Sequence, residues 1–80
     1  MSDTIKRETI FIKSVSGEFF LPRPTSFIAG WARHAWFKHL VGEEAKIVSP
    51  SYWEKLCENN NVSRLVEYAD GRHEIIDEAR

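Results

Sequence analysis

The apolar residues of the chain concentrate in one long central segment, residues 25–42, with shorter β-rich runs on either side. Thr25 or Ser26 can cap the start of a helix there, directly after Pro22-Arg23-Pro24. Gly42 stands where a left-handed residue follows a helix end. At about 100° per residue the segment has a wide apolar arc. That arc contains Trp31, Ala35, Ile28, Ala32, Trp36, Ala29 and Leu40. The pattern predicts a central helix that packs through this arc.

A first β-hairpin is predicted from residues 9–15 and 18–21, which are rich in β-branched and aromatic side chains and are joined by Ser16-Gly17. A two-residue turn would set Ser14 opposite Phe19. The face toward the helix would then carry Ile10, Ile12, Phe19 and Leu21. Phe11 and Phe20 would fall on the opposite, exposed face.

A short strand at Ile47-Val48 precedes a second helix. Ser49 and Pro50 supply an N-cap and a proline at the first helical position, and Ser51 with Glu54 offers a capping box one step later. Asn59-Asn60-Asn61 should end this helix. Its apolar stripe is Tyr52, Trp53, Leu56 and Cys57.

A second hairpin turns at Asp70-Gly71 between residues 64–69 and 72–77. A two-residue turn pairs Val66 with Ile75 and gives one continuous apolar face. A three-residue loop with Gly71 as a bulge pairs Leu65 with Ile75 and Glu67 with His73 instead. The continuous apolar face favours the first register.

The element order β-β-α-β-α-β-β predicts an α+β fold: a small, mainly antiparallel sheet with both helices on one side. We expect residues 1–80 to form a single domain whose ends, 1–7 and 78–80, are frayed. The predicted core is Trp31, Ile28, Ala32, Ala35 and Leu40, surrounded by Ile10, Ile12, Leu21, Val66 and Leu56. Trp31→Ala would then cost roughly 3–5 kcal/mol.

Composition restricts the class of protein further. The chain has 80 residues and one cysteine, which excludes an internal disulfide and fits a reducing compartment. Because no apolar run has the length of a signal core or a membrane span, we expect a cytoplasmic protein. The net charge is −1, but residues 1–40 hold six Lys/Arg and three Asp/Glu (net +3), and residues 41–80 hold five and nine (net −4).

The chemistry-bearing residues predict neither an enzyme nor a cofactor or metal site. His34 and His39 are about 140° apart on a helix and cannot clamp one ion together. Cys57 has apolar or acidic neighbours, which do not activate a thiol. The four glycines of the chain are isolated from one another, so the sequence contains no phosphate-binding loop. No motif assigns the chain to a family.

We therefore expect a protein-interaction module, such as an adaptor, a regulator or an inhibitor of a larger complex, or one that forms a homodimer. The expected partner-binding ridge lies on the less apolar side of the central helix: Arg33, His34, Phe37, Lys38 and Val41. The alternative is a nucleic-acid-binding regulator that uses the basic N-terminal half, where Lys6, Arg7, Lys13 and Arg23 would extend the patch. The alternative to both is that the second helix or its loop covers this ridge and buries it.

Overall fold

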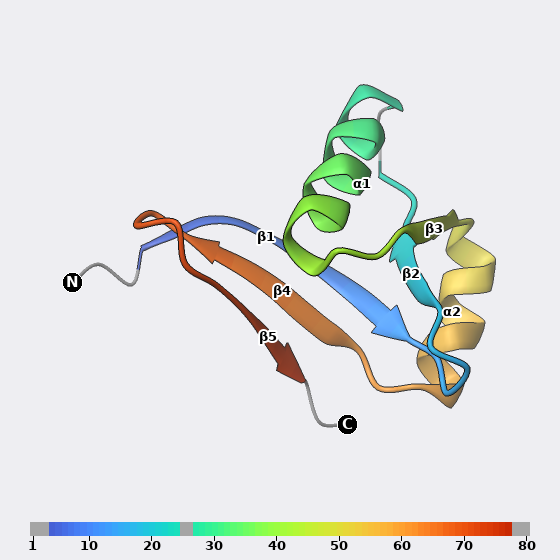
Figure 1. Ribbon diagram of the computed structural model, residues 1–80. Helices are drawn as coiled ribbons and strands as arrows, with labels where there is room; N and C mark the ends of the chain where they lie inside the picture. Colours follow the sequence, from blue (N-terminus) through green and yellow to red (C-terminus); the bar gives the residue numbers. More distant parts are fainter. Residues whose placement is uncertain (1–3, 25–26, 78–80) are drawn as a thin grey trace.

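The computed structural model describes residues 4–24 and 27–77. Within them the elements follow the predicted order: β1 (Ile5–Lys13), β2 (Phe19–Pro22), α1 (Phe27–Val41), β3 (Ala45–Val48), α2 (Pro50–Asn59), β4 (Ser63–Tyr68) and β5 (His73–Asp77) (Figure 1). The α+β class is confirmed. The predicted caps at Thr25 and Ser26 lie outside the described residues. Gly42 follows α1 with φ +85°, as the C′ position predicts.

The five strands form one sheet in the order β3-β2-β1-β4-β5. Three of the pairings are antiparallel, but β2 and β3 are parallel. The parallel pair arises because α1 connects β2 to β3 as a crossover, which returns the chain to the same end of the sheet. The sheet is therefore mixed.

Both hairpins close through three-residue loops that end in a left-handed glycine. In the first, the Ser14 amide donates to the Glu18 carbonyl (2.8 Å) and the Gly17 amide donates to the Ser14 carbonyl (3.0 Å). In the second, Tyr68 and Arg72 form the corresponding pair, and Gly71 donates to Tyr68. Gly17 and Gly71 have φ +90° and +93°. This is the geometry of a turn followed by a glycine bulge.

The third loop residue shifts the first hairpin by one position relative to the prediction. Ile12 lies opposite Phe20, so Phe11 and Phe19 point to the face under α1. A one-residue shift exchanges the two faces of a strand. The expectation that Phe11 and Phe20 are exposed is wrong, since both are buried, and Ile10 is exposed instead. Phe11 turns to the face under α1, whereas Phe20 keeps the opposite face and is in contact there with Tyr52.

The second hairpin adopts the three-residue alternative. Leu65 pairs with Ile75, and Glu67 pairs with His73. The favoured two-residue register is wrong because Gly71, not Asp70, takes the left-handed conformation. The observed register also avoids placing Glu67 against Glu74.

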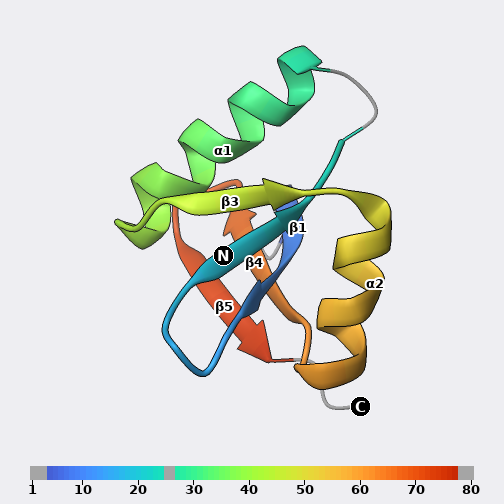
Figure 2. The same ribbon diagram turned by 90° about the vertical axis from the view of Figure 1, so that its right-hand side faces the viewer.

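The main core lies between the sheet and α1, and consists of Phe11, Leu21, Trp36, Phe37, Ala45 and Leu65. Phe20, which alternates with Phe19 and Leu21 along β2, is instead in ring contact with Tyr52 of α2 at 6.2 Å. The two helices thus lie on opposite faces of the sheet, and Figure 2 shows β2 and β3 passing between them. The expectation that both helices share one side is wrong.

The second helix begins and ends as predicted. The Ser49 hydroxyl accepts the Tyr52 amide at 3.3 Å, and Pro50 is the first helical residue. The helix ends at Asn59, where the Asn60 amide donates to the Leu56 carbonyl (2.9 Å). None of its residues is buried, so Leu56 is only half-buried, contrary to the predicted core.

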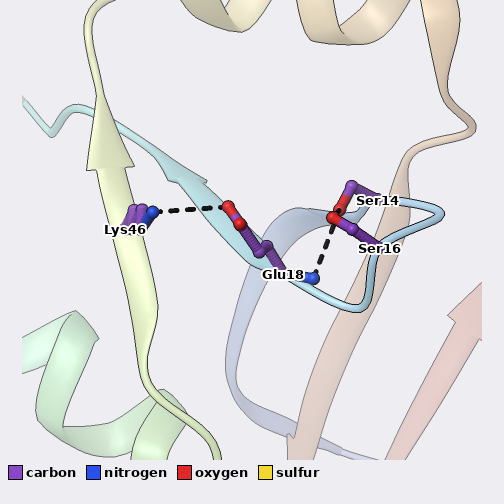
Figure 3. A network of polar contacts seen from close by, with 4 residues as sticks. All are labelled: Ser14, Ser16, Glu18 and Lys46. Carbon is purple, nitrogen blue, oxygen red and sulfur yellow. Dashed lines mark hydrogen bonds and ion pairs between the residues drawn. The ribbon is translucent and has the colours of Figure 1, made fainter.

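Polar side chains connect the first hairpin to strand β3 (Figure 3). The Lys46 ammonium lies 3.3 Å from the Glu18 carboxylate, and the Glu18 amide donates to the Ser14 hydroxyl (3.2 Å). The Ser14 and Ser16 hydroxyls lie 2.8 Å apart. These contacts occupy the end of the sheet where β3 forms the edge.

Strand β1 begins earlier than the predicted strand at residue 9. Ile5 pairs with Tyr68 and Arg7 pairs with Glu67, so the expectation that residues 1–7 fray is wrong for 5–7. Residues 1–3 and 78–80 lie outside the described residues.

Candidate functional site

The predicted partner-binding ridge of α1 does not form one exposed surface. Phe37, its central apolar residue, is 0% exposed and lies in edge contact with the rings of Phe11 (5.2 Å) and Phe19 (5.6 Å). Val41 is half-buried and packs against the same core. The prediction that these two side chains are available to a partner is wrong, because the one-residue shift of the first hairpin turns Phe11 toward this side of the helix, where it joins Phe19.

The charged members of the ridge have separate environments. The Arg33 guanidinium donates to the Pro22 carbonyl at 3.5 Å, and borders a cleft of about 400 Å³ with Glu8, Thr9, Ile10, Pro22 and Arg64. Lys38 donates to Glu44 at 2.9 Å. This hydrogen bond, together with the positive charge of Lys38, lowers the pKa of the Glu44 carboxyl below its usual value. Both side chains are solvent-exposed, so the ion pair adds little to stability.

The side of α1 that faces away from the sheet is the side that the sequence pattern predicted to pack in the core. Trp31 is 70% exposed, and Ala32 and Ala35 are exposed as well. The Trp31 ring stacks on the imidazole of His34, with ring centroids 6.5 Å apart and an interplanar angle of 20°. The predicted burial of Trp31, Ala32 and Ala35 is therefore wrong. The side chains of Ile28 and Ala29 lie outside the described part of the chain.

The buried stripe of α1 runs through Gly30, Trp36 and Phe37 to the half-buried Leu40 and Val41. A Cβ built at Gly30 would lie 2.6 Å from the Pro24 ring, which explains a glycine inside a helix. The large apolar pairs Trp36/Leu40 and Phe37/Val41 are each spaced at i, i+4. These four side chains have more apolar area than the side of the helix that carries Ala32 and Ala35, because an alanine contributes little area on burial. That difference was the signal in the sequence for the buried side.

Trp36 and Arg7 make contacts within the fold. The Trp36 indole Nε1 donates to Glu67 Oε1 at 3.1 Å, and the residue is 8% exposed. The Arg7 guanidinium carbon lies 5.2 Å from the indole centroid, a cation–π contact. One cation of the expected basic patch thus covers the edge of the core.

A cleft of about 500 Å³ opens at the end of the sheet near the first hairpin and the end of α2. Its lining is Lys13, Val15, Glu58, Asn59, Asn60, Asn61, Ser63 and Asp77. The Ser63 hydroxyl donates to Asp77 at 2.8 Å, and the Lys13 ammonium lies 5.5 Å from the Phe19 ring centroid. No residue lining this cleft is a His or Cys, so it offers neither an imidazole base nor a thiol nucleophile.

Two further features concern metals and membranes. Among the described residues, no three His, Cys, Asp or Glu side chains gather closely enough to hold a metal ion, and Cys57 is half-buried. Neither described helix combines the length and the apolar character needed to span a bilayer.

The outward side of α1 is therefore the candidate site, which we call the Trp31 face: Trp31, Ala32, His34, Ala35, Lys38 and His39. All of these residues are exposed except His34, which is half-buried under the Trp31 stack. Comparison with known proteins gives no match to a family model, to a curated protein or to a solved structure.

Proposed function

We propose that this protein is a non-enzymatic interaction module that docks a partner protein on the Trp31 face. The observation that carries the proposal is the 70% exposure of Trp31 on a regular helix. Leaving an indole in water forfeits roughly 2 kcal/mol or more of burial free energy. Tryptophan is also among the residues that most often dominate the binding energy of protein interfaces. A partner that buries the ring recovers that free energy.

The residues around Trp31 support close approach by a partner. Ala35 lies one turn further along the helix and Ala32 lies beside it, and both are exposed. Small side chains next to a large one leave room for a partner's side chains to reach the indole. The imidazole of His34 stacks beside the Trp31 ring and adds a second flat side chain to the surface that a partner would meet.

The charges of α1 indicate the chemistry of the partner. The helix contains Arg33, His34, Lys38 and His39 and no acidic residue. Lys38 and His39 lie at the C-terminal end of the Trp31 face and are exposed. We propose a partner surface with an apolar recess for the indole and carboxylates on its rim. The proposal includes a role as an adaptor, a regulator or an inhibitor of a larger complex, and a cytoplasmic location, which the single cysteine fits.

The test is affinity capture from the native host in nuclease-treated extract, followed by a binding measurement with the purified partner. Trp31→Ala should weaken that binding about 30-fold, the effect of losing a dominant interface residue. Tyr52→Ala is the matched control, since it removes an exposed aromatic ring from the other helix. Equal binding by the parent and by Trp31→Ala would contradict the proposal.

The same experiment separates the nucleic-acid alternative. If capture depends on nucleic acid, nuclease removes it, and the affinity falls steeply as salt is raised. Binding through an apolar aromatic surface changes little with salt. A nucleic-acid signal that is retained in Trp31→Ala and lost on charge reversal at Lys6 and Arg23 would favour that alternative.

A further inference from the structure

The two edges of the sheet differ in how well they are protected against pairing with another strand. Edge strand β3 has four residues, carries Lys46 and is followed closely by Pro50. Lysine, proline and short length are the devices that block unwanted strand pairing. Edge strand β5, His73–Asp77, has five residues and neither lysine nor proline. Figure 1 shows β5 as the outermost strand of the sheet, beyond β4.

The hydrogen bonds of the second hairpin establish which backbone groups of β5 point outward. Tyr68 and Arg72 form a hydrogen-bonded pair, since the Tyr68 amide donates to the Arg72 carbonyl (2.8 Å). Hydrogen-bonded and non-hydrogen-bonded pairs alternate along an antiparallel ladder. Glu74 and Ile76 therefore direct their amides and carbonyls toward β4. His73, Ile75 and Asp77 direct theirs to the open edge.

The same three residues also share one face of the sheet. Ile75 lies opposite Leu65, whose side chain is in the core under α1, yet Ile75 itself is 50% exposed because α1 does not extend over this edge. His73 and Asp77 stand on either side of it, two residues away in each direction. The open edge thus presents an imidazole, an exposed apolar side chain and a carboxylate in a row.

We infer that β5 pairs antiparallel with β5 of a second copy of this chain, centred on Ile75, to join two sheets into one. In this pairing Ile75 meets Ile75 of the other copy, and His73 lies opposite Asp77 at both ends. All three residues with outward backbone groups are used, which gives roughly six new hydrogen bonds. Apolar and opposite-charge pairs are the favourable cross-strand combinations.

Neighbouring registers lose this complementarity. If α1 is to lie on the same side of both sheets, residues of the same face must lie opposite each other. The two-fold axis of the pairing can therefore pass only through a residue, and the neighbouring registers are centred on Glu74 or on Ile76. Centring on Glu74 places two glutamates directly opposite each other. Centring on Ile76 places Ile75 against Asp77 and takes His73 out of its charge pair. The pairing centred on Ile75 is therefore the specific one.

Amide hydrogen exchange by NMR tests the pairing residue by residue. The amides of His73, Ile75 and Asp77 should exchange more slowly as protein concentration rises, while those of Glu74 and Ile76, bonded to β4, should not change with concentration. Sedimentation over the same range should show a monomer–dimer equilibrium. A protein that stays monomeric up to about 1 mM, the concentration where weak association becomes visible, would overturn the inference.

Matched variants locate the interface. Ile75→Lys brings two ammonium groups together at the symmetry axis and should abolish the dimer, while Ile47→Lys changes a similarly exposed isoleucine (40%) on the other edge and should leave it intact. His73→Asp should weaken dimerisation on the order of tenfold, since symmetry repeats the like-charge pair twice. Adding Asp77→Lys to His73→Asp should restore it.

Two results would place the contact elsewhere and overturn the proposal. One is a dimer that survives Ile75→Lys and is lost in Ile47→Lys. The other is a dimer that survives Ile75→Lys and is lost in Trp31→Ala, which would assign self-association to the Trp31 face. The circular dichroism spectrum of each variant tests whether the monomer is still folded. This control separates loss of association from loss of structure.

Discussion

Trp31 and Trp36 stand five residues apart on one helix and have opposite environments. Trp36 is 8% exposed, donates a hydrogen bond to Glu67 and lies beside the Arg7 guanidinium. Trp31 is 70% exposed and contacts the imidazole of His34. The identical side chain thus serves the core in one position and the surface in the other. Residue type alone does not assign a tryptophan to the core, since five residues place it about 140° further around the helix.

Substitutions on the inner side of α1 should reduce stability more than substitutions on its outward side, and the largest reduction is expected at Phe37. Phe37→Ala should lower the free energy of unfolding by about 3–5 kcal/mol, since the ring is fully buried between Phe11 and Phe19 and leaves a cavity. Chemical denaturation followed by circular dichroism measures the change. Phe37→Leu is the control, which should cost about 1.5 kcal/mol or less because it retains most of the volume. A small change in Phe37→Ala would mean that the inner side is not the core.

Trp36→Phe should have an intermediate effect of roughly 1–2 kcal/mol. The substitution keeps an aromatic ring but removes the indole donor, leaving the half-buried Glu67 without this hydrogen bond. The urea midpoint of the variant is the measurement. Combining it with Glu67→Ala, which removes the acceptor, in a double-mutant cycle isolates the hydrogen bond. Strict additivity of the two changes would show that the contact contributes nothing.

Trp31→Ala should have the smallest effect on stability, within about 0.5 kcal/mol, because the ring is mostly exposed and alanine favours the helix. Thermal unfolding of the variant beside its parent tests this. The result bears directly on the comparison of the two tryptophans. If the melting temperature instead falls by as much as for Phe37→Ala, the Trp31 face would belong to a buried contact.

The elements of the fold were predictable because their signals are local. Ser49-Pro50 specifies the start of α2 through a side-chain cap and a residue that needs no amide partner. Gly42 ends α1 in the left-handed conformation. The two hairpins were identified from their glycines, but their loops contain three residues instead of two. A two-residue and a three-residue loop use the same glycine, so turn composition does not distinguish the two registers.

That single residue accounts for most of the differences between prediction and structure. It turns Phe11 toward α1, where Phe11 joins Phe19, and both rings pack against Phe37. The helix then packs through Trp36 and Phe37, and Trp31, Ala32 and Ala35 become the outward side. The fold divides the predicted ridge between the two sides of the helix: Phe37 and Val41 belong to the core, while His34 and Lys38 are on the Trp31 face.

The sequence by itself determined the α+β class, the order of the seven elements and the presence of one unusually apolar helix, since periodicity, caps and turn residues act over a few neighbouring positions. Only the tertiary structure decided which side of that helix is buried, because two apolar stripes compete and the choice depends on strand register. It also decided that β2 and β3 run parallel and that β5 forms an edge without lysine or proline. Those outcomes depend on contacts between segments distant in sequence, which local patterns do not encode.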